Sequence, residues 1–163
     1  MTKFRCAFAL TLPLVAAASL AGCASPVPLT PAESANDPHC AAVTVRLPNE
    51  LAGFAKRATN AQATGAWGDP AAVLTRCGLP VSEPTVNPCI NLNGVDWVID
   101  ESEAPLFRFE AYGREPGFEV FVDSDQTSGT DVLLELQSAV ERLPQVRQCS
   151  NVADARTIEQ GDS

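Results

Sequence analysis

Hydrophobic and polar positions alternate over three consecutive segments in the second half of the chain, and this alternation predicts three strands. The predicted strands are residues 95–100, 107–112 and 118–122. The connections, residues 101–105 and 113–117, are short enough for hairpins, so we expect an antiparallel meander. A fourth strand is predicted over residues 71–77, after the turn sequence Trp67-Gly68-Asp69-Pro70.

A helix is predicted near the end of the chain, over residues 130–143. Its apolar residues fall on one side of the helix, which is typical of packing against a core. Ser128 and Asp131 have the spacing of a capping box, and Pro144 ends the element.

A shorter helix is predicted over residues 38–46, because Asp37 can accept backbone N–H groups and Pro38 suits a first helical turn. Apolar and polar residues also alternate over residues 43–47, which is typical of a strand. We favour the helix, and Pro48 ends either element.

Two segments give weaker patterns. Residues 51–63 indicate a helical turn followed by loop, and residues 78–94 contain three prolines, which exclude one continuous regular element. Together these elements predict an α+β fold, an antiparallel four-stranded meander sheet with helices packed on one face.

The beginning of the chain has the features of an export signal. Lys3 and Arg5 form a basic start, and residues 6–19 form an apolar run too short to span a bilayer comfortably. The following Leu20-Ala21-Gly22-Cys23 resembles the lipobox of bacterial lipoproteins. This resemblance implies a diacylglyceryl group on the Cys23 thiol and cleavage after Gly22. The alternatives are an ordinary secretory signal peptide or an N-terminal membrane helix, and the ordered set of features favours lipidation.

The chain then divides into four parts. Residues 1–22 are predicted as the signal peptide, residues 23–37 as a flexible tether rich in Pro, Ser and Ala, residues 38–149 as a single globular domain, and residues 150–163 as a polar C-terminal tail.

The mature chain is strongly acidic. The net charge of the 163 residues is −9, and losing residues 1–22, with the two charges of Lys3 and Arg5, leaves 141 residues with a charge of −11. Such a chain is repelled by phosphate backbones and anionic headgroups. We therefore expect no nucleic-acid partner and no electrostatic docking to membranes, and membrane contact only through the lipid on Cys23.

Four cysteines remain once Cys6 leaves with the signal peptide and Cys23 carries the lipid: Cys40, Cys77, Cys89 and Cys149. An even number in an exported chain predicts two disulfides, with three possible pairings. We favour a Cys77–Cys89 pair, which is close in sequence, and a Cys40–Cys149 pair, which ties the ends of the domain together. The spacing contains no Cys-x-x-Cys, so we expect no metal and no other cofactor.

The turn motifs together resemble an uncharacterised family of exported actinobacterial proteins, catalogued as a domain of unknown function. The motifs are Trp67-Gly68-Asp69-Pro70, Arg76-Cys77-Gly78 with Pro80, Cys89, Gly94-Val95-Asp96-Trp97, Gly113-Arg114-x-Pro116 and Cys149. The resemblance covers residues 40–149 and implies an envelope location. It names no catalytic residue.

Residues for acid/base chemistry are present but not arranged as a known motif. A hydrolase triad needs a positioned base, and the single histidine, His39, borders the predicted tether. Two clusters of carboxylates lie in predicted turns: Asp100, Glu101 and Glu103, and then Asp123, Asp125 and Asp131. The second begins like a calcium loop but lacks its glycine and its final glutamate. We interpret both clusters as solvated turns.

A ligand groove is the sharper hypothesis. Tryptophans beside charged groups can stack on a sugar or peptide while the acids accept hydrogen bonds. The candidate residues are Trp67, Asp69, Arg76, Asp96, Trp97 and Arg114. The alternative is that Trp97 belongs to the core and that the arginines form structural ion pairs.

These observations predict a lipid-anchored protein on the extracytoplasmic side of the cell membrane, with a non-enzymatic role as a binding or assembly factor of the envelope. Its expected partner is an envelope protein or glycan. The alternative is an envelope enzyme that uses carboxylates on glycan or peptide substrates.

Overall fold

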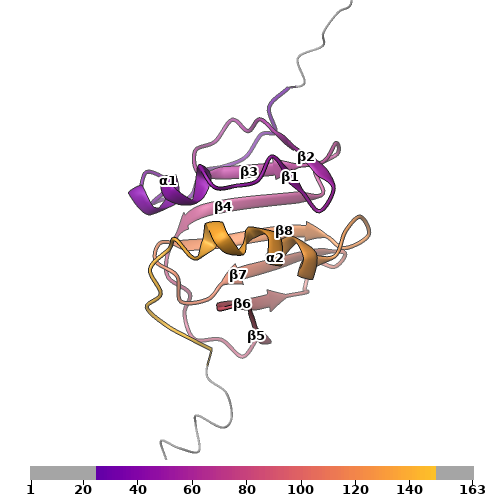
Figure 1. Ribbon diagram of the computed structural model, residues 1–163. Coiled ribbons are helices and arrows are strands. Elements are labelled where there is room, and N and C mark those ends of the chain that lie inside the picture. The colour runs from indigo at the N-terminus through magenta and orange to yellow at the C-terminus, as the bar shows by residue number, and fades with distance from the viewer. Residues whose placement is uncertain (1–24, 150–163) are drawn as a thin grey trace, which may run out of the picture.

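The computed structural model describes residues 25–149, which form one eight-stranded antiparallel sheet and two helices (Figure 1). The strands are β1 (Glu50–Leu51), β2 (Phe54–Arg57), β3 (Thr64–Trp67), β4 (Val73–Leu79), β5 (Cys89–Leu92), β6 (Val95–Asp100), β7 (Leu106–Ala111) and β8 (Gly117–Asp123). Their order across the sheet is β1-β2-β3-β4-β8-β7-β6-β5. The sheet is thus two four-stranded meanders joined where β4 pairs with β8.

The predicted four-stranded sheet was therefore wrong in strand number. The structure contains the four expected strands as β4, β6, β7 and β8, and the hairpins that connect β6, β7 and β8 are confirmed. The other four strands escaped prediction for physical reasons. The strands β1, β2 and β5 have two to four residues, too few for an alternation to be visible, and all four residues of β3 are buried.

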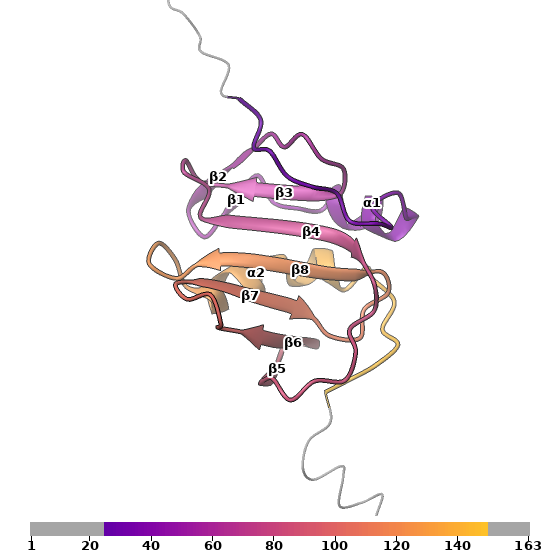
Figure 2. The same ribbon diagram turned by 180° about the vertical axis from the view of Figure 1, so that it is seen from behind.

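Helices α1 (Pro38–Thr44) and α2 (Gly129–Val140) confirm the two predicted helices. The Asp37 side chain accepts the backbone N–H of His39 at the start of α1, and the Ser128 side chain accepts that of Asp131 at the start of α2. Helix α2 lies in front of the sheet in Figure 1 and behind it in Figure 2, and α1 contacts α2 and β4.

The core lies between the helices and the sheet. The largest side chains with less than 2% exposure include Trp67, Trp97, Phe118, Leu51, Leu133, Leu136 and Leu143. They come from both meanders, from α2 and from the residues just after it, so a single core stabilises both halves of the sheet.

Two disulfides join the four predicted cysteines, but in a different pairing. Cys40 of α1 bonds to Cys77 of β4, and Cys89 of β5 bonds to Cys149, with Cα–Cα distances of 5.6 and 6.2 Å. The expected Cys77–Cys89 pair was wrong because β8, β7 and β6 lie between β4 and β5. Four strand spacings, roughly 19 Å, exceed the reach of a disulfide. The disulfides indicate an extracytoplasmic location.

The segment before α1 lies against the domain and does not extend away from it as expected for a tether. Val27 pairs in parallel with Thr59, its N–H bonding the Ala58 carbonyl at 2.8 Å. Further along, the Ser34 N–H donates to the Gly78 carbonyl at 3.0 Å. The predicted signal peptide, Cys23 and the predicted C-terminal tail lie outside the described residues. Within residues 25–149, neither helix has the length and apolar character needed to cross a bilayer.

Candidate functional site

The face of the sheet opposite α1 and α2, here called the open face, carries no helix among the described residues (Figure 2). Alternation along the strands decides which side chains it presents. On the central strands these include Leu74 and Arg76 of β4, Arg108 and Glu110 of β7, and Glu119 and Phe121 of β8. The open face therefore places four charged groups over the joint between the two meanders.

These four groups form one hydrogen-bonded network, here called the open-face network. Glu119 accepts Arg76 Nε and Arg108 Nε, each at 2.7 Å, on its two carboxylate oxygens. Arg108 also donates from Nη2 to Glu110 at 2.9 Å, and Ser82 Oγ donates to the other oxygen of Glu110. The Glu119 side chain is 1% exposed, while each arginine is about a third exposed.

Arg108 makes this arrangement possible. Glu110 and Glu119 are direct cross-strand partners, and two carboxylates at such a position repel each other. Burial alone would disfavour the charged guanidinium of Arg108, but hydrogen bonds and charges from Glu119 and Glu110 outweigh it and raise the pKa of Arg108. The arginine therefore stays charged and holds both acids.

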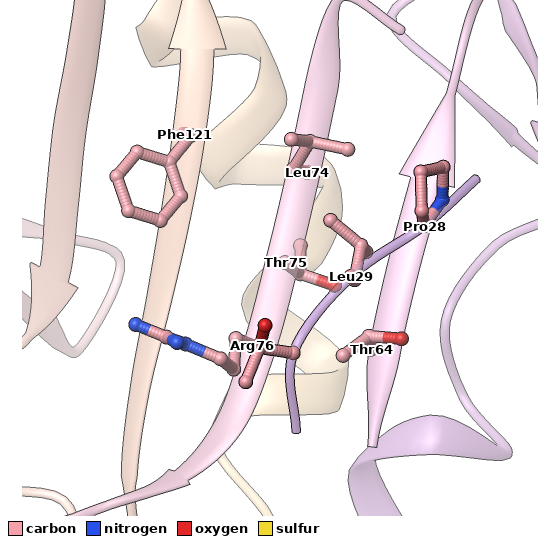
Figure 3. Close-up of a pocket in the computed structure, with 8 residues that line it drawn as sticks. Pro28, Leu29, Thr64, Leu74, Thr75, Arg76 and Phe121 are labelled. Atoms are coloured by element: carbon pink, nitrogen blue, oxygen red, sulfur yellow. The ribbon is translucent and has the colours of Figure 1, made fainter. Parts of the chain in front are cut away.

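A cavity of about 290 Å³ opens beside the network, where residues 28–30 cross over β3 and β4 (Figure 3). Leu29, Leu74 and Phe121 supply apolar wall, and Arg76 is the one charged residue among those that line it. A smaller cavity of about 110 Å³, lined by Asp100, Glu103 and Arg108 among others, also contacts Phe121. The open face thus has an apolar cavity and an acidic one, with Phe121 between them.

Neither tryptophan of the predicted groove can stack on a ligand, because both side chains are 0% exposed. The Trp67 indole N–H donates to the Pro48 carbonyl at 3.0 Å. Trp97 packs in the core, as the alternative interpretation expected, and its indole N–H has no partner among the described residues.

The charged members of that groove lie in three places: Arg76 on the open face, Asp69 at an exposed corner, and Asp96 near enough to Arg114 for its charge to act on the guanidinium. Arg114 is buried and donates to the carbonyls of Leu143 and Gly94, at 2.9 and 3.1 Å. Asp96 accepts the Asn91 side-chain amide and the Cys149 N–H, while Asp69 pairs with Arg57 at an exposed corner. Of the six predicted residues, Arg76 alone takes part in the open-face network.

The remaining candidates lie in turns. His39 is exposed, and its Nδ1 pairs with Asp37 at 2.9 Å. Asp100 accepts hydrogen bonds from Ser102, which lower the pKa of that carboxyl. Asp123 accepts the Asp125 N–H and the Gln126 side chain. Over residues 25–149, no three His, Cys, Asp or Glu side chains gather in a way that could hold a metal ion.

Sequence reasoning missed Glu119, Arg108, Glu110 and Ser82. The first three lie at polar positions of predicted strands, so the alternation placed them on the side away from the core. A search for opposite charges on the polar faces of neighbouring strands would have found them. Ser82 lies in the proline-rich loop before β5, where no local pattern identifies it.

Comparison with known proteins identifies a family. Neither the curated proteins nor the solved structures contain a match to this chain. A family model described as "Protein of unknown function (DUF3515)" matches residues 5–148, a range that includes both helices and all eight strands. The chain therefore belongs to the DUF3515 family of proteins of unknown function.

Proposed function

We propose that the protein is a lipid-anchored, extracytoplasmic binding or assembly factor of the cell envelope, which holds its partner on the open face of its sheet. The single observation that carries the proposal is this face, where a hydrogen-bonded charge network and two cavities lie without a covering helix in the described part of the chain. The partner we propose is an envelope protein or glycan.

The anchor would hold this face close to the membrane. Cys23 precedes Ser25 by two residues, and the Ser25 carbonyl already accepts a hydrogen bond from Arg57 at 3.3 Å. A diacylglyceryl group on Cys23 supplies two chains, which is enough for stable anchoring. Confinement at the membrane raises the effective concentration of the domain for a partner located there.

The geometry supports binding more than acid/base catalysis. The carboxylate oxygens of Glu119 and Glu110 already accept hydrogen bonds from Arg76, Arg108 and Ser82, so the network holds both acids as fixed, partnered groups. The charged groups are held in place before a partner arrives, which lowers the ordering cost of binding. An envelope enzyme acting through carboxylates on glycan or peptide remains the alternative function.

Site-specific photo-crosslinking tests the proposal in membranes that contain the full chain. A photoreactive phenylalanine analogue at position 121 probes the open face, and the same analogue at the exposed Leu134 of α2 is the matched control. We expect an envelope protein or glycan adduct from position 121 and none from position 134. Equal adducts from both positions, or recovery of the Cys23→Ala chain in the membrane fraction, would contradict the proposal.

A further inference from the structure

We propose that the cavity beneath residues 28–30 binds one acyl chain of an anionic membrane lipid, with Arg76 as the contact for its headgroup. The inference depends on the proposed anchor in one respect, because the anchor keeps the domain at a membrane that supplies the lipid. The cavity itself is formed by described residues of the domain and does not depend on the anchor. It adds a ligand site to the proposed partner-binding role of the open face.

The walls of the cavity fit an aliphatic chain. Leu29 of the crossing segment lies beside Leu74 of β4, Pro28 lies on the side of β3, and Phe121 of β8 stands on the other side of Leu74 (Figure 3). Leu74 and Phe121 are cross-strand partners, so they form a continuous apolar floor. The volume of about 290 Å³ is close to the lower limit of ordinary ligand pockets, so the cavity has room for one acyl chain but not for a whole lipid.

Arg76 gives the cavity a polar end. Its Nε donates to Glu119 at 2.7 Å and its Nη2 lies 2.5 Å from the same carboxylate oxygen, while Nη1 makes no hydrogen bond to another described residue. The Arg76 side chain is about a third exposed, and Arg108 binds the other oxygen of Glu119. The guanidinium therefore keeps N–H donors for a second anion, and guanidinium groups suit phosphate oxygens. The adjacent cavity has the carboxylates of Asp100 and Glu103 in its wall, which repel an anionic headgroup. The headgroup is therefore expected at Arg76 and not in the adjacent cavity.

The acidic charge of the whole chain does not oppose this binding. Within the open-face network the charges of Arg76 and Arg108 balance those of Glu119 and Glu110, and Arg76 is the one of these four that lines the cavity. Charges farther away in solvent are screened beyond about 8 Å at physiological salt. The crossing segment follows Cys23 by five residues at Pro28, so an anchored domain brings the cavity to the bilayer without electrostatic attraction.

The experiment uses the full-length chain in membranes. The probe is phosphatidylglycerol with a photoactivatable group on one acyl chain, and phosphatidylcholine with the same chain is the matched neutral lipid. We expect labelled peptides that contain Leu29, Leu74 or Phe121, with severalfold more label from phosphatidylglycerol. Photoactivatable dodecanoic acid is a third probe, and labelling of these peptides by the free acid without labelling by phosphatidylglycerol would overturn the assignment to a membrane lipid.

Variants separate the two ends of the cavity. Arg76→Gln should reduce phosphatidylglycerol labelling to the phosphatidylcholine level, and Arg76→Lys should keep part of the preference. Leu74→Trp, which fills the cavity, should reduce labelling by both lipids severalfold. Leu29→Ser removes apolar wall from the half-buried crossing segment and should also reduce labelling by both lipids, without a change in the sheet. Arg57→Gln is the control, because Arg57 is another arginine beside the crossing segment but lies outside the cavity.

The outcomes distinguish this inference from the proposed anchor. A chain that is recovered in the soluble fraction but is labelled in the cavity by added vesicles disproves the anchor and supports the inference. An anchored chain without cavity labelling, or labelling that is equal for both lipids and unchanged in Arg76→Gln, overturns the inference.

Discussion

Arg76 and Glu119 are direct cross-strand partners at the joint between the two meanders, and Arg76 Nε donates to the Glu119 carboxylate at 2.7 Å. The carboxylate is almost completely buried, and it can be so because Arg108 binds its second oxygen from the other neighbouring strand. A buried charge without such partners would be very costly. The pair therefore ties β4 to β8 and at the same time builds the charged part of the candidate site.

Glu119→Gln should lower the free energy of unfolding by about 1–3 kcal/mol. Removal of one partner from a fully buried ion pair costs about 3–5 kcal/mol, and the solvent exposure of the two arginines reduces this. Urea denaturation of the oxidised protein measures the change. Glu103→Gln on an exposed turn is the control, with an expected change within about 0.5 kcal/mol. Equal effects of the two substitutions would contradict the structural role of Glu119.

The same pair marks how far the sequence could predict the site. Arg76 was a candidate from its neighbouring motif, but its partner lies 43 residues later and becomes adjacent only because β8 returns to pair with β4. Alternation predicts which face a residue occupies, and it does not predict which strands become neighbours across a long connection. For that reason the polar residues were assigned to the right face without the network being recognised.

The fold shows a similar division. Helix α2 and strands β6 to β8 have strong periodic patterns and were predicted close to their observed bounds. Strand β3 (Thr64–Trp67) is buried on both faces and so shows no alternation, and β5 begins at Cys89, directly after three spaced prolines. The tryptophans were misassigned to a groove because turn motifs adjoin them, while burial depends on the whole sheet.

Non-reducing peptide mapping should find Cys40 linked to Cys77 and Cys89 linked to Cys149. Loop entropy predicts that each bond contributes a similar amount, about 4 kcal/mol, to the free energy of unfolding.

Cys40 and Cys77 are buried in the core, so alanines at both positions also leave a cavity. We expect that double variant to lose about 1–2 kcal/mol more than Cys89→Ala with Cys149→Ala, measured by urea denaturation. A peptide linking Cys77 to Cys89 would contradict the observed topology.

Iodide should quench little of the tryptophan fluorescence of the native protein, because both indoles are completely buried. In denaturant, quenching should rise to that of free N-acetyltryptophanamide, which serves as the reference. Titration with envelope glycans should likewise leave the native emission unchanged. Strong quenching of the native state would place one of the rings at the surface, and the predicted stacking groove would then regain support.

The start of α1 should become less stable in acid. The backbone N–H of His39 donates to Asp37 and holds the pKa of that carboxyl below its ordinary value of 3.8, with a further hydrogen bond and charge from the His39 ring. A carboxyl whose pKa is lower in the folded state stabilises the fold above its unfolded pKa, and this contribution is lost as the pH falls through the folded value. Asp37→Asn keeps a capping side chain that does not titrate. The difference in unfolding free energy between about pH 6 and pH 3 should therefore be smaller in Asp37→Asn than in the parent chain. The same difference in both proteins would show that Asp37 does not contribute to the acid sensitivity of the fold.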